Sequence, residues 1–153
     1  MGCGKTTVGK FLSQKLSLKF VDTDYCIESQ MNISVSEIFE KYGESYFRFL
    51  ENELVKKSES FIPSVLSLGG GMLENHKNIH ILKRTGKIIY LEASILTIKE
   101  RLKYDNTRPL LKKAENLEAL YNSRRKIYTS AADIIVCADK SPYTICRDIV
   151  NKL

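Results

Sequence analysis

The feature that most constrains this fold is the sequence Gly2-Cys3-Gly4-Lys5-Thr6-Thr7. It matches the end of a phosphate-binding loop, G-x-x-x-x-G-K-[ST], in which backbone N–H groups hold phosphates and the lysine reaches the outer phosphate oxygens. Such a loop connects a buried strand to a helix whose N-terminus attracts anions. The sequence therefore predicts an α/β domain built on a nucleotide-phosphate site, although the strand and the first glycine of the loop do not precede Met1.

The rest of the chain alternates amphipathic segments with short apolar runs. Apolar residues repeat at helical spacing over residues 6–16, 27–60 with a break at Gly43, 75–83, 95–102, 115–128 and 143–150. Short apolar runs, which predict strands, cover residues 19–21, 64–68, 87–91 and 133–137. Strands that alternate with helices predict one domain with a mainly parallel sheet. Either Ser34 or Ser36 can cap a helix within the second segment.

Composition is typical of an ordinary folded protein and argues against several classes. The 153 residues are 43% hydrophobic and 27% charged, with a net charge of +6 that suits anionic ligands. The basic residues form no stripe interleaved with aromatics, so nucleic-acid binding is not expected. The four cysteines lie far apart and indicate neither zinc nor a disulfide framework. Without a long apolar segment or a signal-peptide pattern, the sequence predicts a cytoplasmic protein, which we expect to be monomeric.

The phosphate loop supplies groups suited to phosphoryl transfer. Lys5 would neutralise charge on the transferring phosphate, and the Thr6 hydroxyl would ligate Mg²⁺. The triplet Asp22-Thr23-Asp24 follows a predicted strand, at the edge where ligands bind in open α/β sheets. Its two carboxylates can instead simply cap the next helix, and this interpretation stays open.

Six motifs in order make the chain resemble the shikimate kinases along its whole length. They are residues 1–7, Asp22-Thr23-Asp24, Phe47-Arg48-Phe49-Leu50-Glu51, Gly69-Gly70-Gly71, Arg108-Pro109-Leu110-Leu111 and Arg124-Arg125-Lys126-Ile127-Tyr128. The resemblance implies a three-layer α/β/α fold of the P-loop kinases, with a parallel sheet in the order 2-3-1-4-5. It implies ATP as co-substrate, Mg²⁺ as cofactor, and phosphorylation of the 3-hydroxyl of shikimate.

The resemblance also assigns a substrate side to the site, on helices over about residues 24–60. Asp24 would orient or deprotonate the attacking hydroxyl, and Arg48 and Arg124 would bind the shikimate carboxylate. Glu51 would steady Arg48, although a simple surface pair between these two residues is an equally open interpretation. Arg125 is the alternative to Arg124. Backbone amides of Gly69, Gly70 and Gly71 would approach the substrate ring, whereas the plainer interpretation of these glycines is a turn.

On the nucleotide side, the resemblance assigns ATP to the loop residues Gly2, Cys3, Gly4, Lys5, Thr6 and Thr7. Asp22 would hold Mg²⁺ through water. Arg108 would close over the transferring phosphate from a lid at about residues 104–114, a polar segment without periodicity. Arg101 would pack on adenine, and residues 139–142 would edge the base.

One departure from the family pattern stands out. The absent first strand belongs in the middle of the sheet, so we expect the natural chain to begin about ten residues upstream with a short apolar strand and a glycine. Two other functions stay open: a related small-molecule kinase that acts on a substrate such as gluconate, and a nucleotide-binding or partner-binding module that has lost catalysis. Shikimate-dependent ADP release distinguishes the three.

Overall fold

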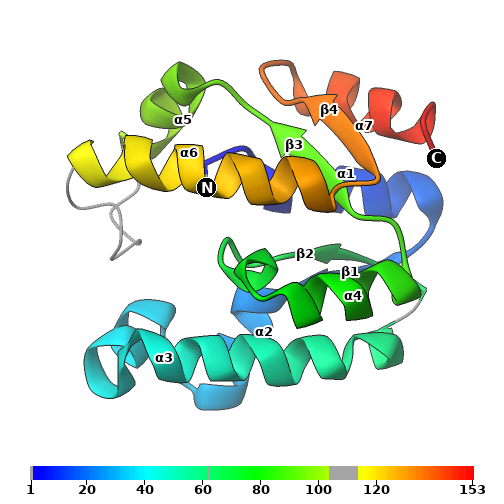
Figure 1. Cartoon of the computed structure of the whole chain (residues 1–153). Helices are drawn as coiled ribbons and strands as arrows, with labels where there is room; N and C mark the ends of the chain where they lie inside the picture. The colour runs from blue at the N-terminus through cyan, green and yellow to red at the C-terminus, as the bar shows by residue number, and fades with distance from the viewer. Residues whose placement is uncertain (1, 62, 104–113) are drawn as a thin grey trace.

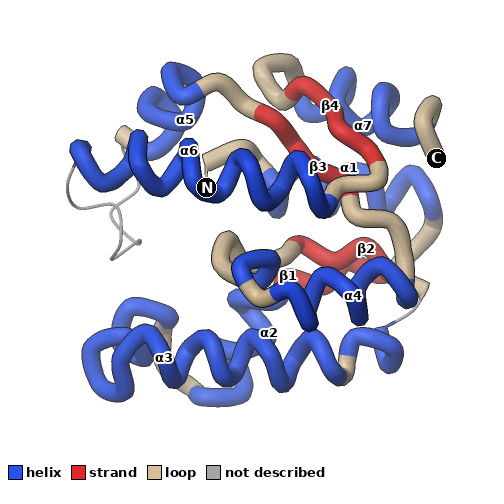
Figure 2. Tube along the Cα trace, in the orientation of Figure 1, coloured by secondary structure: helices blue, strands red, loops and turns tan. Residues whose placement is uncertain are grey.

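The computed structural model describes residues 2–61, 63–103 and 114–153. In these ranges four short strands form two parallel pairs, drawn in red in Figure 2. Strand β1 (Lys19–Asp22) pairs with β2 (Ser64–Ser67), and β3 (Ile89–Glu92) pairs with β4 (Ile134–Cys137). A strand order of 2-3-1-4-5 without its first strand leaves these two pairs, so the predicted topology is confirmed.

Helices cover both faces of the strands (Figure 1). They are α1 (Lys5–Leu16), α2 (Thr23–Met31), α3 (Val35–Lys56), α4 (His76–Thr85), α5 (Ile95–Leu102), α6 (Ala114–Ala131) and α7 (Pro142–Val150). Two short 3₁₀ helices, η1 (Ser58–Phe61) and η2 (Met72–Glu74), were not expected from the sequence. The predicted helical segments are all present, with ends that differ by a few residues.

Local capping explains where the helices begin and bend. The Ser34 hydroxyl accepts from the N–H of Glu37, whose carboxylate accepts from the N–H of Ser34 in return, so Ser34 rather than Ser36 caps α3. Gly43 interrupts α3 at φ 80° and ψ 167°, as its position in the pattern predicts. Ser94 caps α5 through the N–H of Thr97. Helix α2 begins at Thr23, four residues earlier than predicted, because Asp22 caps it.

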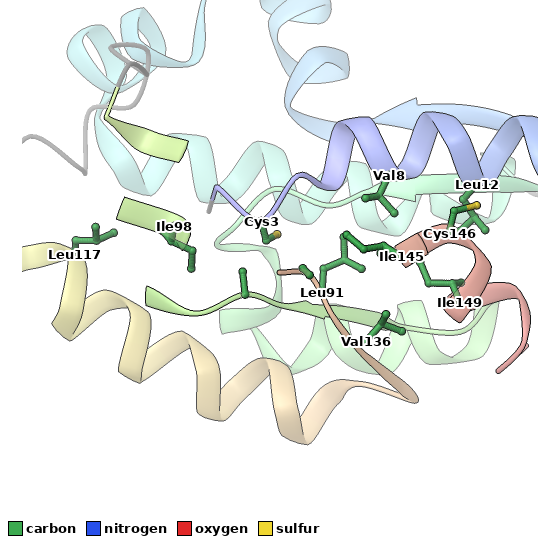
Figure 3. Packing of buried hydrophobic residues seen from close by; sticks show 12 residues of the cluster. Cys3, Val8, Leu12, Leu91, Ile98, Leu117, Val136, Ile145, Cys146 and Ile149 are labelled. Carbon is green, nitrogen blue, oxygen red and sulfur yellow. The ribbon is translucent and has the colours of Figure 1, made fainter. Parts of the chain in front are cut away.

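The largest buried cluster lies between β3, β4 and the helices α1, α5 and α7 (Figure 3). Leu12, Val136 and Ile145 pack together in it, and Cys3 at the start of the chain is buried beside them. A second cluster fills the space under η2 and α4, and a third joins α2 to α3. The first cluster anchors α1, and with it the phosphate loop, against the strands.

Two further observations bear on the surroundings of the protein. The four cysteines are free thiols. None of the helices in the described part of the chain has the length and hydropathy needed to cross a membrane.

Candidate active site

The phosphate loop has the backbone geometry that its glycines predict. Gly2 and Gly4 have φ values of 57° and 84°, in the left-handed region that favours glycine. Helix α1 begins immediately after Gly4, whose carbonyl accepts the first helical bond from the N–H of Val8 at 2.9 Å. The free N–H groups of this first turn give the site a positive end that attracts phosphate.

Thr6 and Asp22, the two residues predicted to bind metal, lie in contact. The Thr6 hydroxyl donates to Asp22 Oδ2 at 2.9 Å. The other oxygen, Oδ1, accepts from the N–H groups of Asp24 and Tyr25, so Asp22 also caps α2. In the described residues no group of three or more His, Cys, Asp or Glu side chains is arranged to hold a metal. A hydroxyl and one carboxylate suit Mg²⁺, which completes its shell with phosphate oxygens and water.

The other residues of the phosphate loop differ in whether their side chains are buried or exposed at the candidate site. Cys3 is buried in the main core cluster, so its side chain is not available to a ligand. Thr6 and Thr7 line a small cavity of about 200 Å³ beside the first turns of α1.

On the other side of the loop, Arg101 donates to the carbonyl oxygen of Ala138 at 3.0 Å and lies 3.5 Å from the carbonyl oxygen of Gly2. This places a guanidinium between the phosphate loop and the segment after β4. Arg108 and all of the predicted lid except Ala114 lie outside the described residues.

Gly69 follows β2 at a point where two carboxylates converge. A Cβ atom on Gly69 would lie 2.5 Å from Asp24 Oδ1 and 2.7 Å from Glu51 Oε1. No side chain fits there, because both oxygens belong to residues held by helices α2 and α3. The N–H of Gly69 donates to the Thr23 hydroxyl at 2.8 Å, which fixes the backbone beside Asp24.

The next two glycines make room for two guanidinium groups. A Cβ on Gly71 would lie 1.9 Å from Arg48 Nη1, and one on Gly70 would lie 3.1 Å from Arg124 Nη1. None of the three glycines has a positive φ. The three glycines lie in the turn from β2 to η2, as their plainer interpretation holds, and they also let charged side chains approach the backbone closely.

Arg48 and Glu51 form the predicted pair, but inside the protein rather than on its surface. Arg48 Nη1 lies 2.5 Å from Glu51 Oε2, and Nη2 lies 2.8 Å from Glu44 Oε1. The side chain of Glu51 is only 1% exposed. Burial raises the pKa of Glu51 to about 7, against the attraction of Arg48, and the negative charge of Asp24 adds to the rise.

Arg124, rather than Arg125, lies at the triple glycine. Arg124 is 5% exposed and donates from Nε to Glu74 at 2.8 Å. Arg125 points elsewhere, with a side chain that is 54% exposed and paired with Glu92. Tyr128, one turn further along α6, donates to the carbonyl of Gly70 at 2.5 Å.

Sequence reasoning missed Glu74 as a member of the site. Its position three residues after the last glycine follows no recognisable motif, and the ion pair joins residues 50 positions apart. Tyr128 ends the last of the six motifs without a predicted role, and in the structure its bond to Gly70 ties α6 to the triple glycine.

The buried Glu51 predicts a specific pH dependence of stability. Below its ordinary pKa of 4.5 the carboxyl is protonated in both the folded and the unfolded chain. As pH rises, the unfolded chain ionises first, so the free energy of unfolding falls until the folded pKa of about 7 is passed. The loss amounts to about 3 kcal/mol.

Urea unfolding of the protein and of Glu51→Gln at about pH 5 and about pH 8 measures this loss. We expect the variant to gain stability relative to the parent between the two values, because glutamine does not titrate. Two curves that stay parallel with pH would show that Glu51 ionises normally in the folded protein.

These observations define a class of protein. A glycine loop at a helix N-terminus, a hydroxyl and carboxylate pair beside it, and a buried cluster of arginines and carboxylates opposite constitute a P-loop kinase of small molecules. The parallel strands covered by helices on both faces are the α/β/α fold of that class.

Comparison with known proteins identifies the family. The family model described as shikimate kinase matches residues 1–153. Shikimate kinases of Sulfurihydrogenibium sp. and Persephonella marina are each 40% identical over 154 residues, which cover 100% of this chain and 93% and 94% of theirs. The crystal structure of shikimate kinase from Aquifex aeolicus has a TM-score of 0.88 at 36% identity, over 99% of this chain and 90% of that one. Shikimate kinase from Acinetobacter baumannii, in complex with shikimate, has a TM-score of 0.91 at 30% identity, over 99% of this chain and 87% of that one. The chain belongs to the shikimate kinase family.

Proposed function

We propose that the chain transfers the γ-phosphate of ATP to the 3-hydroxyl of shikimate and so produces 3-phosphoshikimate and ADP. The observation that carries the proposal is the convergence of Asp24, Arg48 and Arg124 on the triple glycine. Two guanidinium groups and a carboxylate suit a substrate that offers one carboxylate and several hydroxyls. The solved neighbour from Acinetobacter baumannii, whose complex contains shikimate, supports the same substrate.

On the nucleotide side, each residue has a task that follows from its chemistry. Backbone N–H groups from Gly2 to Thr7 bind the phosphates at the N-terminus of α1. Lys5 neutralises charge on the phosphate in transfer, which is where stabilisation lowers the barrier most. Thr6 and Asp22 would hold Mg²⁺, whose charge also offsets that of the phosphates.

On the substrate side, the arginines bind and the carboxylates position. Arg48 and Arg124 bind the shikimate carboxylate, while Glu51 and Glu74 hold the two guanidinium groups in place. Asp24 accepts the hydrogen bond of the attacking hydroxyl and orients it toward the phosphate. Backbone amides of the three glycines would approach the substrate ring, while the charged side chains take the space that Cβ atoms would need.

Arg101 and Arg108 complete the proposed site. Arg101 lies beside the phosphate loop and would stack on the adenine ring, since guanidinium planes pack on aromatic faces. Arg108 would reach the transferring phosphate from a lid at about residues 104–114 that excludes water, because hydrolysis of ATP competes with transfer. The helices over about residues 24–60 would form the substrate-binding part of a single domain.

We also propose that the enzyme is a cytoplasmic monomer that binds neither nucleic acid nor membranes. Its free thiols suit a reducing compartment. Size-exclusion chromatography with light scattering measures the mass in solution, and a stable dimer would contradict the proposal.

A coupled assay of ADP release tests the function directly. We expect release to depend on shikimate and on Mg²⁺, and not to rise above background when gluconate replaces shikimate. Turnover with gluconate would favour the related kinase. Tight ATP binding without shikimate-dependent release would favour the module that has lost catalysis.

Gly71→Ala is expected to weaken shikimate binding without unfolding the protein. The new Cβ would occupy the position of Arg48 Nη1, so the guanidinium must leave the pocket while the flexible side chain relieves the clash. We expect the KM for shikimate to rise at least about tenfold and the KM for ATP to stay nearly constant. Steady-state kinetics with each substrate varied in turn measures both values.

Gly86→Ala is the matched control. A Cβ on Gly86 meets no atom within 4 Å, and the backbone there is extended. Its kinetics are expected to match the parent. A normal KM for shikimate in Gly71→Ala would remove Arg48 from the proposed site.

A further inference from the structure

All three nitrogens of the Arg48 guanidinium donate to carboxylates of its own helix. Nη1 donates to Glu51 Oε2 at 2.5 Å, Nη2 donates to Glu44 Oε1 at 2.8 Å, and Nε donates to the same Glu44 oxygen at 3.2 Å. A guanidinium forms a pair of parallel bonds to a carboxylate through its Nη1–Nη2 edge or its Nε–Nη2 edge. Buried Glu51 shares the first of these edges, and Glu44 holds the second.

The two glutamates differ in how easily they can give up Arg48. The side chain of Glu51 is 1% exposed, whereas that of Glu44 is 48% exposed. A buried carboxylate that loses its partner is left as an uncompensated charge, which is costly. An exposed carboxylate exchanges its partner for water at little cost, because exposed ion pairs contribute little. A competing carboxylate would therefore replace Glu44 and not Glu51.

The backbone beside Glu44 leaves room for this exchange. Gly43 interrupts α3 with a φ of 80°, and a Cβ at this position would meet no atom within 4 Å. Residues 44–56 form the helical run after the break, so Glu44 is the first residue of that run. A carboxylate in the first turn of a helix is stabilised by the helix dipole. Glu44 released from Arg48 thus keeps a favourable position in open surroundings.

We propose that Glu44 is an internal competitor for the carboxylate of shikimate. It occupies the Nε–Nη2 edge of Arg48 in the free protein, and the substrate displaces it on binding. This displacement rests on the proposed function, which supplies the substrate with its carboxylate. The substrate accepts the two hydrogen bonds that Glu44 gives up, while Glu51 continues to hold Nη1. Glu44 thereby lowers the affinity of the site for shikimate.

Glu44→Gln tests the proposal, because it keeps the size of the side chain and removes its charge. We expect the Kd of shikimate, measured by calorimetry without nucleotide, to fall about threefold, which is the scale of one partly exposed ion pair. The KM for shikimate is expected to fall with it, and the KM for ATP to stay nearly constant. A residue that only held Arg48 in place would have the opposite effect, since its loss would weaken shikimate binding.

Two comparisons separate competition at Arg48 from a general effect of charge. Glu53→Gln removes the same charge from the same helix, where Glu53 pairs with Lys56 at 2.6 Å, and its Kd is expected to stay within about 1.5-fold of the parent. Glu44→Gln is also made in an Arg48→Lys background, because an ammonium group has no Nε–Nη2 edge. NMR titration with millimolar shikimate measures binding there, and we expect the gain in affinity to disappear.

The possible results distinguish the displacement from the proposed function. An unchanged or raised Kd in Glu44→Gln would overturn the displacement and leave the function intact, because the parent still binds shikimate. An equal gain in Glu53→Gln or in the Arg48→Lys background would also overturn it, in favour of a general effect of negative charge. A parent protein that binds no shikimate would contradict the proposed function and the displacement together.

Discussion

Lys5→Ala is expected to lower kcat at least about 100-fold while changing the KM for shikimate by less than about threefold. Lys5 lies at the first position of α1, where its ammonium group can follow the phosphate as charge develops on it. The Arg48 and Arg124 cluster, which we propose binds shikimate, is not altered by this change. Initial rates with saturating ATP and varied shikimate measure the two parameters.

Lys10→Ala is the matched control for loss of a positive charge on the same helix. Lys10 is exposed and lies more than one turn from the loop. Its kcat is expected to stay within about twofold of the parent. If both lysine variants lost activity equally, the effect would reflect the overall charge of α1 rather than a role of Lys5 in transfer.

Arg124→Ala is expected to raise the KM for shikimate at least about 100-fold and to leave the KM for ATP nearly unchanged. Arg124 is buried, and its loss leaves the carboxylate of the substrate facing Glu74 without an intervening positive charge. An uncompensated buried charge is costly, which is why the expected effect is large. Kinetics with each substrate varied separately, together with a thermal melt, distinguish weaker binding from unfolding.

The neighbouring arginine provides the control. Arg125→Ala removes the same side chain from the exposed face of α6 and breaks only the surface pair with Glu92. Surface pairs contribute little, so we expect nearly normal kinetics and stability. Equal increases in both KM values for Arg124→Ala would indicate a general disturbance of the site and contradict its assignment to shikimate.

Much of the fold could be predicted from the sequence because its signals are local. Apolar spacing located the helices and strands, and Gly43 marked the interruption of α3. The choice between Ser34 and Ser36 stayed open because both precede apolar residues. The reciprocal bonds of Ser34 with Glu37 decide it in the structure.

The site was less predictable because its parts come together only in three dimensions. A pair at i,i+3, such as Arg48 and Glu51, has the same spacing on a surface as in a core, so the burial of Glu51 could not be deduced. The contact of Glu74 with Arg124 depends on how α6 crosses the triple glycine. The order of the motifs placed the triple glycine in the site. The close approach of charged side chains to these glycines is visible only in the packing.

The burial of Glu51 has a consequence for substrate binding. In the described residues, four carboxylates (Asp24, Glu44, Glu51 and Glu74) surround two guanidinium groups, so another negative charge is resisted unless one carboxylate is neutral. Glu51, with a pKa of about 7, is the group placed to take up a proton. Shikimate binding near neutral pH should then consume protons, with an enthalpy that depends on the buffer and an affinity that falls as the pH rises above 7. The kinase would thereby sense acidity through the binding of its substrate.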